Sequence, residues 1–274
     1  MLHNNYNKTI SFTEKTFLMN GISKDYFTQE QKSQIERNLK HKSCQRNEVI
    51  FREGHPAFRV YFIKSGIIKL WKEGVNFVEQ TIRFAKEGDM IGFWGSYENN
   101  NYSLSATAIT DIEISYIEKD FFMPVVQDSP SLQIIFHDYI KELKKTEDDL
   151  RNMAEMNVRE KVAHSILVLL HVFKDLKDDH TYKAVLSRKA IASLSAVSED
   201  RVSKQLSEFK KENIIGQDDD RMHIDQTALK EITKSFPWYN SPLLSFSLVI
   251  ETHFPFFAEF HHLLYWNILN TSFL

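Results

Sequence analysis

The chain has 274 residues, of which 42% are hydrophobic and 26% are charged, and its formal net charge at neutral pH is −3. These totals are typical of a soluble globular protein with room for two domains, and they exclude a globally basic nucleic-acid binder, although a small module can carry its own positive face. Cys44 is the only cysteine, which excludes an intrachain disulfide and favours a cytoplasmic location. The longest charge-free apolar stretch, 236–250, is interrupted by prolines and serines, so we expect no membrane span.

The amino-terminal residues 1–27 show little periodicity and are predicted to form a loosely attached arm. Thr28 and Gln31 then have the spacing of a capping box. Ile35 and Leu39 give the helix that follows an apolar side. We therefore expect a short amphipathic helix from residue 28 onward.

From about residue 42 to 122 the chain changes to short β-rich runs separated by turn residues, and six of the eight glycines fall here. The runs cover 49–51, 60–63, 67–71, 77–84 and 112–117. Because glycine adopts backbone conformations that tight turns require, glycines concentrated in one region indicate many such turns. The pattern predicts a small barrel or roll.

A long helix is predicted next, beginning at Ser129-Pro130, because proline is favoured at the first helical position. Its apolar residues recur at alternating threes and fours: Leu132, Ile135, Phe136, Tyr139, Leu143, Leu150 and Met153. Such a stripe packs either against the chain's own roll or against a partner helix. We favour a dimer seam, because charged residues occupy much of the rest of the helix. Asn157 with Glu160 caps a second helix that reaches Phe173.

Two short helices around a three-residue turn are predicted between residues 187 and 209. Ser187 and Ser198 stand at the N-cap positions. Apolar residues give each helix a buried side: Ile191 and Leu194 in the first, Val202, Leu206 and Phe209 in the second. A polar outer face on the second helix is what a helix-turn-helix needs to enter a major groove.

An amphipathic helical hairpin without DNA-binding activity would show the same periodicity, and acidic residues in a first turn are favoured by the helix dipole alone. Residues 187–212 contain six Lys or Arg against four Asp or Glu, so 6 − 4 leaves a local charge of +2. This charge has the sign that DNA binding requires.

The sequences of these segments resemble those of one known family. One segment resembles the end of the helix-turn-helix and the wing of the CRP/FNR family. It has the sequence Leu206-Ser207-Glu208-Phe209-Lys210-Lys211-Glu212-Asn213-Ile214-Ile215, followed by Gly216 and then by Met222-His223-Ile224. Three further segments resemble successive turns of the family's cyclic-nucleotide-binding-type roll. They are Glu53-Gly54-His55, residues 61–70 and Glu87-Gly88-Asp89-Met90-Ile91-Gly92.

The resemblance implies an α+β fold with an N-terminal double-stranded β-helix or jelly-roll domain, a long dimerisation helix and a C-terminal winged helix-turn-helix domain. The expected boundaries are an arm at 1–27, the roll at 28–128, the dimerisation helix at 129–156, the DNA-binding domain at 157–232 and an extension at 233–274.

The implied function is a transcription regulator rather than an enzyme, a homodimer on near-palindromic double-stranded DNA, with RNA polymerase as a partner if it activates. Asp200, Ser203 and Lys204, together with Glu199, stand where the family contacts bases. Lysine replaces the family's arginine and loses its bidentate fork on guanine. Phosphate contacts are expected from Arg188, Lys189, Arg201 and Ser207.

The effector of the roll is the open question. Family members that bind cyclic AMP use a Glu for the ribose and an Arg-Ser pair for the phosphate, but Phe93 and Tyr102 stand at the Glu and Arg positions and only Ser103 is kept. A buried phosphate without its guanidinium is unpaired, which disfavours cyclic nucleotides. The residues Phe93, Trp94, Tyr97, Tyr102 and Ser103 either line a pocket for a flatter, less charged effector or simply fill the roll.

Other chemistries find little support, and we assign no catalytic residue, metal ligand or cofactor. An iron–sulfur cluster needs about four thiolates, which Cys44 cannot supply. Haem would depend on the lone turn residue His55, and a cupin-type oxygenase needs clustered histidines and carboxylates that residues 42–122 lack. A protein-interaction module that has lost DNA binding is the remaining alternative.

The last forty or so residues, beyond about 235, are rich in aromatic side chains and have few charges. So apolar a segment is expected to bury against its own chain, a second subunit or a partner. Its candidate metal ligands are Glu251, His253, Glu259, His261 and His262. A metal site is disfavoured, because consecutive histidines point apart on a helix.

Overall fold

A computed structural model of the chain describes residues 28–74, 79–97, 100–127, 130–174, 186–218 and 221–235. The expected arm at 1–27, and the extension from residue 236 onward with its candidate metal residues, lie outside the described residues.

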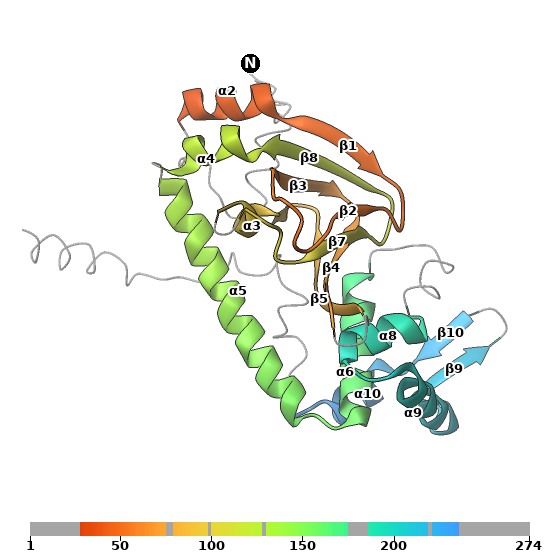
Figure 1. The fold of residues 1–274 in the computed structure, drawn as a ribbon. Helices are drawn as coiled ribbons and strands as arrows, with labels where there is room; N and C mark the ends of the chain where they lie inside the picture. The colour runs from red at the N-terminus through yellow and green to blue at the C-terminus, as the bar shows by residue number, and fades with distance from the viewer. Residues whose placement is uncertain are drawn as a thin grey trace, which may run out of the picture. The chain divides into compact units, whose positions relative to one another are not determined.

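Two antiparallel four-stranded sheets form the predicted roll (Figure 1). The first contains, in spatial order, β1 (Lys40–Cys44), β8 (Ile112–Glu118), β3 (Arg59–Ser65) and β6 (Met90–Ile91). The second contains β2 (Val49–Phe51), β7 (Ser105–Ala108), β4 (Ile67–Glu73) and β5 (Glu79–Lys86). Ile63, Ile68 and Ile114, each at most 1% exposed, belong to the hydrophobic core of the roll.

Both faces of the first sheet are buried, which explains why β3 reads as a continuous apolar run. Val60 and Phe62 point away from the roll interior and pack with Ile35 and Phe122. These partners come from α2 (Gln29–Asn38) and α4 (Lys119–Gln127), and α3 (Phe93–Tyr97) adds to the same cluster. The predicted capping box of Thr28 and Gln31 is confirmed.

Two glycines hold turns of the roll that other residues would not fit. Gly66 has φ +86°, and a Cβ there would lie 2.5 Å from the Asp111 carbonyl oxygen. Gly92 has φ +84°, and its Cβ would lie 2.9 Å from the Arg59 carbonyl oxygen. Both turns therefore require glycine for conformation and for space.

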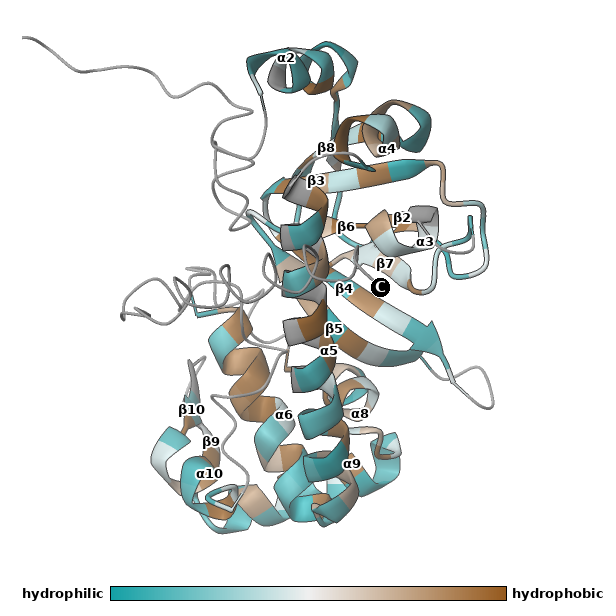
Figure 2. Cartoon of the chain, turned by 90° about the vertical axis from the view of Figure 1, so that its left-hand side faces the viewer, coloured by the Kyte–Doolittle hydropathy of each residue, from teal (hydrophilic) through white to brown (hydrophobic). Residues whose placement is uncertain are grey.

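The helical half begins with α5 (Pro130–Glu155) and α6 (Val158–Val172), and the capping box of Asn157 and Glu160 is confirmed at the start of α6. Every residue from 162 to 170 is buried, so α6 is the central helix of its domain, and Figure 2 colours much of it brown, as hydrophobic. Around it lie α8 (Arg188–Ser195), α9 (Glu199–Lys211) and α10 (Gln226–Ile232). The predicted wing is the hairpin of β9 (Ile215–Asp218) and β10 (Arg221–Ile224).

The core of the helical domain continues onto the outer face of the second sheet. Ile67 and Phe84 of the roll join the cluster around α6, and the Phe84 ring meets the Phe173 ring edge-on at 5.8 Å. Thr81 donates its backbone N–H to Ser193 Oγ at 3.1 Å, and the two hydroxyl oxygens lie 2.8 Å apart. The first helix of the helix-turn-helix is thus fastened to β5 by apolar and polar contacts.

Candidate nucleic-acid interface

The predicted helix-turn-helix is present as α8, a turn at 196–198 and α9. Ser187 Oγ accepts a hydrogen bond from the Ala190 N–H at 3.2 Å, as expected of an N-cap. Ser198 holds the N-cap position of α9, but its side chain makes no capping bond. Ala196 turns the chain with φ +53°, a left-handed conformation that is more usual for glycine or asparagine.

The buried side of α9 differs in two positions from the prediction. Val202 and Phe209 are fully buried as expected, but Leu206 is only partly buried, and Gln205 is 7% exposed beside them. The Gln205 Nε2 has no hydrogen-bond partner among the described residues. Apolar periodicity alone could not identify a glutamine as an inward-facing residue.

The expected base-reading residues share one face of α9. Asp200, Ser203 and Lys204 stand at i, i+3 and i+4, which places them side by side on a helix. Glu199, Asp200 and Lys204 are exposed, and Ser203 is half-buried. The structure therefore leaves this polar face open for a partner.

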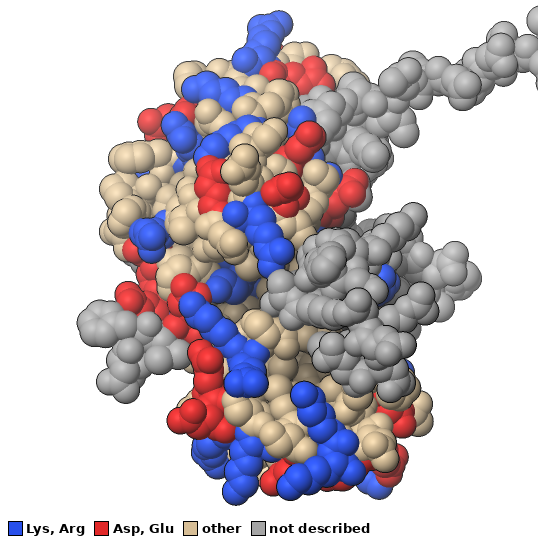
Figure 3. Space-filling model, turned by 90° about the vertical axis from the view of Figure 1, so that its right-hand side faces the viewer, with Lys and Arg blue, Asp and Glu red and all other residues tan. Residues whose placement is uncertain are grey.

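The expected phosphate contacts fall into two groups. Arg188 and Arg201 are exposed, and Figure 3 shows lysine and arginine side chains spread over the lower end of the molecule, which contains α8 and α9. Ser207 is exposed, and its Oγ donates to the Ser203 carbonyl oxygen at 2.9 Å. Lys189 is exposed as well, but it lines a hollow between α8 and the roll.

The far end of α9 is joined to the start of α6. Arg159 binds both carboxylate oxygens of Glu212, with its Nη1 2.8 Å from Oε1 and its Nη2 2.5 Å from Oε2. The guanidinium also lies 4.8 Å from the centre of the Phe209 ring. Hydrogen bonding by Arg159 lowers the pKa of the Glu212 carboxyl, which stays ionised and paired.

The seam predicted on α5 divides into two parts. Leu132 and Phe136 contact the chain's own roll domain, Leu132 in the cluster around Phe122 and Phe136 with its ring 5.4 Å from Trp94. Farther along, Leu143 is 46% and Leu150 65% exposed, and Ile140, which the prediction did not include, is 61% exposed. Met153 is half-buried, whereas the side chains of Ile135 and Tyr139 lie outside the described residues.

The residues proposed for an effector pocket do not come together as one lining. Phe93 is 1% exposed in the cluster with Phe62 and Phe122, and Trp94 packs edge-on against it at 4.9 Å. Tyr102 belongs to the separate cluster inside the roll, and Ser103 is exposed. The Tyr97 side chain lies outside the described residues.

Tyr102 occupies the position where the resemblance leads us to expect an arginine. Its ring stacks on Phe51 with 4.0 Å between centroids, and its hydroxyl donates to the Arg59 carbonyl oxygen at 3.1 Å. Burial raises the pKa of the Tyr102 phenol above its usual range, so the ring is neutral. An aromatic stack therefore fills this part of the roll.

The family of cyclic nucleotide-binding domains matches residues 41–129, which span the roll. A CRP-like cAMP-activated global transcriptional regulator of Mycobacterium tuberculosis is 25% identical over 170 residues, covering 60% of this chain and 74% of that protein. The fumarate and nitrate reduction regulatory protein of Yersinia pestis is 25% identical over 176 residues, 64% of this chain and 70% of that protein. These matches support a transcription regulator of the CRP/FNR type.

Solved CRP/FNR structures have the same fold. A CRP-family regulator from Thermus thermophilus superposes with a TM-score of 0.59 at 20% identity, covering 70% of this chain and 96% of that chain. A CRP/FNR-family protein from Eubacterium rectale gives a TM-score of 0.65 at 15% identity, covering 77% and 96%. The α+β fold expected from the sequence is confirmed. No helix in the described ranges combines the length and hydropathy of a membrane span.

Proposed function

We propose that the chain is a regulator that binds DNA as a homodimer in the cytoplasm, with α9 of each subunit in the major groove of one half-site. The observation that carries this is the exposed polar face of α9, backed by Val202 and Phe209 and preceded by a capped α8. Helix-turn-helix proteins read bases with such a face. We assign it no catalytic role, and RNA polymerase is a further partner if the protein activates transcription.

The specific reader is expected to be Lys204. Its replacement by alanine should weaken binding by about 1–3 kcal/mol per half-site and relax selection at one base position. Lys210→Ala serves as the matched control, because this exposed lysine lies in the last turn of the same helix. Selection of bound sequences from a random pool measures both effects, and an unchanged consensus for Lys204→Ala would contradict the assignment.

Phosphate contacts should behave differently. Arg188→Ala and Arg201→Ala are expected to weaken binding to all sequences alike and to lower the salt slope by about one per contact. Fluorescence anisotropy at several salt concentrations measures the slope. A changed sequence preference with an unaltered slope would remove these residues from the phosphate set.

The dimer is proposed to form through the exposed part of α5. Ile140, Leu143 and Leu150 present a stripe that water would otherwise contact, at the spacing of a two-helix seam. Leu143→Glu with Leu150→Glu should give a folded monomer in sedimentation equilibrium, because like charges would face each other. Lys144→Glu, exposed at the adjacent position, is the control. A double variant that remains dimeric would place the interface elsewhere.

The roll is proposed not to bind cyclic nucleotides. Supporting this, Phe93 and Tyr102 are packed into two apolar clusters at the positions where a ribose and a cyclic phosphate would need polar partners. Burying a phosphate against such rings would leave its charge unpaired.

A further inference from the structure

A hollow with a volume of about 360 Å³ lies between the second sheet and α8. Its apolar wall includes Phe84, Leu169 and Phe173. The indole of Trp71 adds a flat surface and is held by a 2.9 Å hydrogen bond from its Nε1 to Thr107 Oγ1. A hollow of this size fits a ligand no larger than a mononucleotide, because small-molecule sites usually measure about 300–1,000 Å³.

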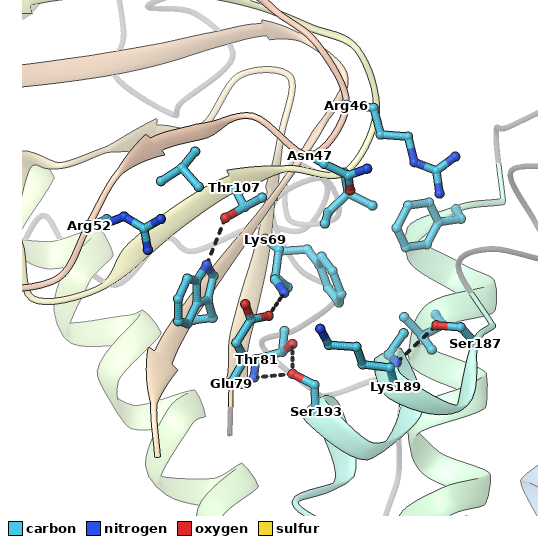
Figure 4. Close-up of a pocket in the computed structure, with 17 residues that line it drawn as sticks. Arg46, Asn47, Arg52, Lys69, Glu79, Thr81, Thr107, Ser187, Lys189 and Ser193 are labelled. Atoms are coloured by element: carbon cyan, nitrogen blue, oxygen red, sulfur yellow. Dashed lines mark hydrogen bonds and ion pairs between the residues drawn. The ribbon is translucent and has the colours of Figure 1, made fainter. Parts of the chain in front are cut away.

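Positive side chains line this hollow from both sides. Among the described residues that line it, Arg46, Arg52 and Lys69 come from the roll and Lys189 from α8, and Glu79 is the one acid. Figure 4 shows Arg46 extending from the roll above Ser187, while Lys189 reaches from α8 toward the side where Glu79 and Thr81 lie. Four positive charges against one negative charge leave a surplus of three.

Only one of these cations is neutralised within the lining. Lys69 Nζ lies 2.6 Å from Glu79 Oε2. In the part of the chain that the structure describes, Arg46, Arg52 and Lys189 form no ion pair with an acidic side chain. The N-terminus of α8 lies at the same hollow, with Ser187 and Ala190 in the lining. Its dipole adds to the attraction for an anion.

We propose that this hollow binds a small metabolite carrying a terminal phosphate or pyrophosphate group, with its less polar part against Trp71 and Phe84. A terminal phosphate carries nearly two negative charges at neutral pH, and arginine pairs with its oxygens through two parallel hydrogen bonds. A cyclic phosphodiester carries only one negative charge and matches the surplus of three less well. This site is separate from the interior of the roll.

The site also has a consequence for regulation, which rests on the proposed DNA binding. Lys189 is the one expected phosphate contact that lines the hollow, and Ser193 of the same helix is bonded to Thr81 of the roll. A bound phosphate group would hold α8 against the roll and occupy Lys189. The ligand should therefore weaken operator binding.

The site itself is tested without DNA, by calorimetric titration of the full chain with inorganic pyrophosphate. We expect saturable binding with one site per subunit, and at least a tenfold loss of affinity in Arg46→Ala and in Lys189→Ala, each of which removes a charge-assisted contact. Arg37→Ala, an exposed arginine of α2 outside the hollow, is the matched control and should bind normally. Glu79→Gln should bind more tightly, because it releases Lys69.

Absence of saturable binding in the wild-type chain would overturn the proposal, as would an equal loss in Arg37→Ala. Citrate, a trianion without phosphorus, should bind at least about tenfold more weakly than pyrophosphate, since the site is proposed to select phosphate geometry. Equal binding of citrate would overturn that selectivity.

A second measurement, of operator binding by fluorescence anisotropy, tests separately whether ligand binding in the hollow affects DNA binding. Pyrophosphate should weaken DNA binding of the wild type but not of Arg46→Ala, whose DNA affinity alone should be normal. Calorimetric binding without any effect on a measurable DNA affinity would contradict the coupling, whereas absence of DNA binding altogether would contradict the proposed function instead.

Discussion

The interior of the roll and the hollow on its outer face differ in almost every physical property. Inside, the Phe51 ring stacks on those of Tyr61 and Tyr102, and Tyr102 stands where the family resemblance leads us to expect an arginine. Outside, Arg46, Arg52 and Lys189 surround an open space. This difference underlies both proposals, that the roll interior binds no cyclic nucleotide and that the outer hollow binds a phosphate group.

The filled interior should depend strongly on its aromatic residues. Phe51→Ala is expected to lower the free energy of unfolding by about 3–5 kcal/mol, because it leaves a cavity beside the rings of Tyr61 and Tyr102. Phe121→Ala, at a position that is 55% exposed, should change it by less than about 0.5 kcal/mol. Urea denaturation measures both, and equal effects would mean that the interior of the roll is loosely packed.

The helical wall of the hollow should be more sensitive to acid than the roll. His164 on α6 is 5% exposed, its Nδ1 has no partner among the described residues, and burial lowers its pKa from 6.5 to about 4. Because the unfolded chain takes up the proton first, stability is complete above pH 6.5 and is lost as the pH falls toward 4, by about 3 kcal/mol in total.

This dependence is read from denaturation midpoints at successive pH values. His164→Leu should flatten the curve between pH 6.5 and 4 relative to the wild type. His223→Gln, at an exposed position of β10, is the control and should leave the curve unchanged. A wild-type slope retained in His164→Leu would assign the effect to other groups.

The polar contact between the two regions should have a smaller effect. Ser193→Ala removes the acceptor of the Thr81 N–H and is expected to destabilise the protein by about 1–3 kcal/mol. Ser207→Ala, an exposed serine on α9, should have little effect on stability. Thermal melts compare the two, and an unchanged melt for Ser193→Ala would indicate that water replaces the hydroxyl without loss.

The smallest expected effect is that of cyclic nucleotides on the roll. Cyclic AMP and cyclic GMP should leave the melting temperature unchanged. A ligand that binds the folded protein would, at a hundred times its Kd, raise the free energy of unfolding by about 2.7 kcal/mol, which a melt would detect. A clear upward shift with cyclic AMP would show that Ser103 and backbone N–H groups hold the phosphate without an arginine, and it would end the distinction between the two regions.

Much of the fold follows from the sequence, because capping residues and apolar periodicity are local signals. The caps at Thr28, Asn157 and Ser187 are confirmed, as are the strands that contain long apolar runs. The missed strands lack such runs. β1 is exposed at all but its last residue, and β7 has the small residues Ser-Ala-Thr-Ala, so only pairing with neighbouring strands reveals them.

The candidate sites also divide into one that local sequence signals predict and one that depends on tertiary packing. The placement of Asp200, Ser203 and Lys204 on one face of α9 was predictable, since it depends on the spacing of residues within one helix. The hollow was not, because Arg46, Lys69 and Lys189 are far apart in the sequence and meet only through the packing of α8 on the second sheet. The inward position of Gln205 was also missed, since its polarity hides it from any apolar pattern.

The two parallel hydrogen bonds between Arg159 and Glu212 affect how the helices can move. They fasten the first turn of α6 to the residue that ends α9, while the apolar core joins the same two helices along their length. Only Met156 and Asn157 separate α6 from the end of α5. A torsion at these two residues would therefore move α6 and α9 together as one body, and it would also have to separate Ser193 from Thr81, because α8 is bonded to β5.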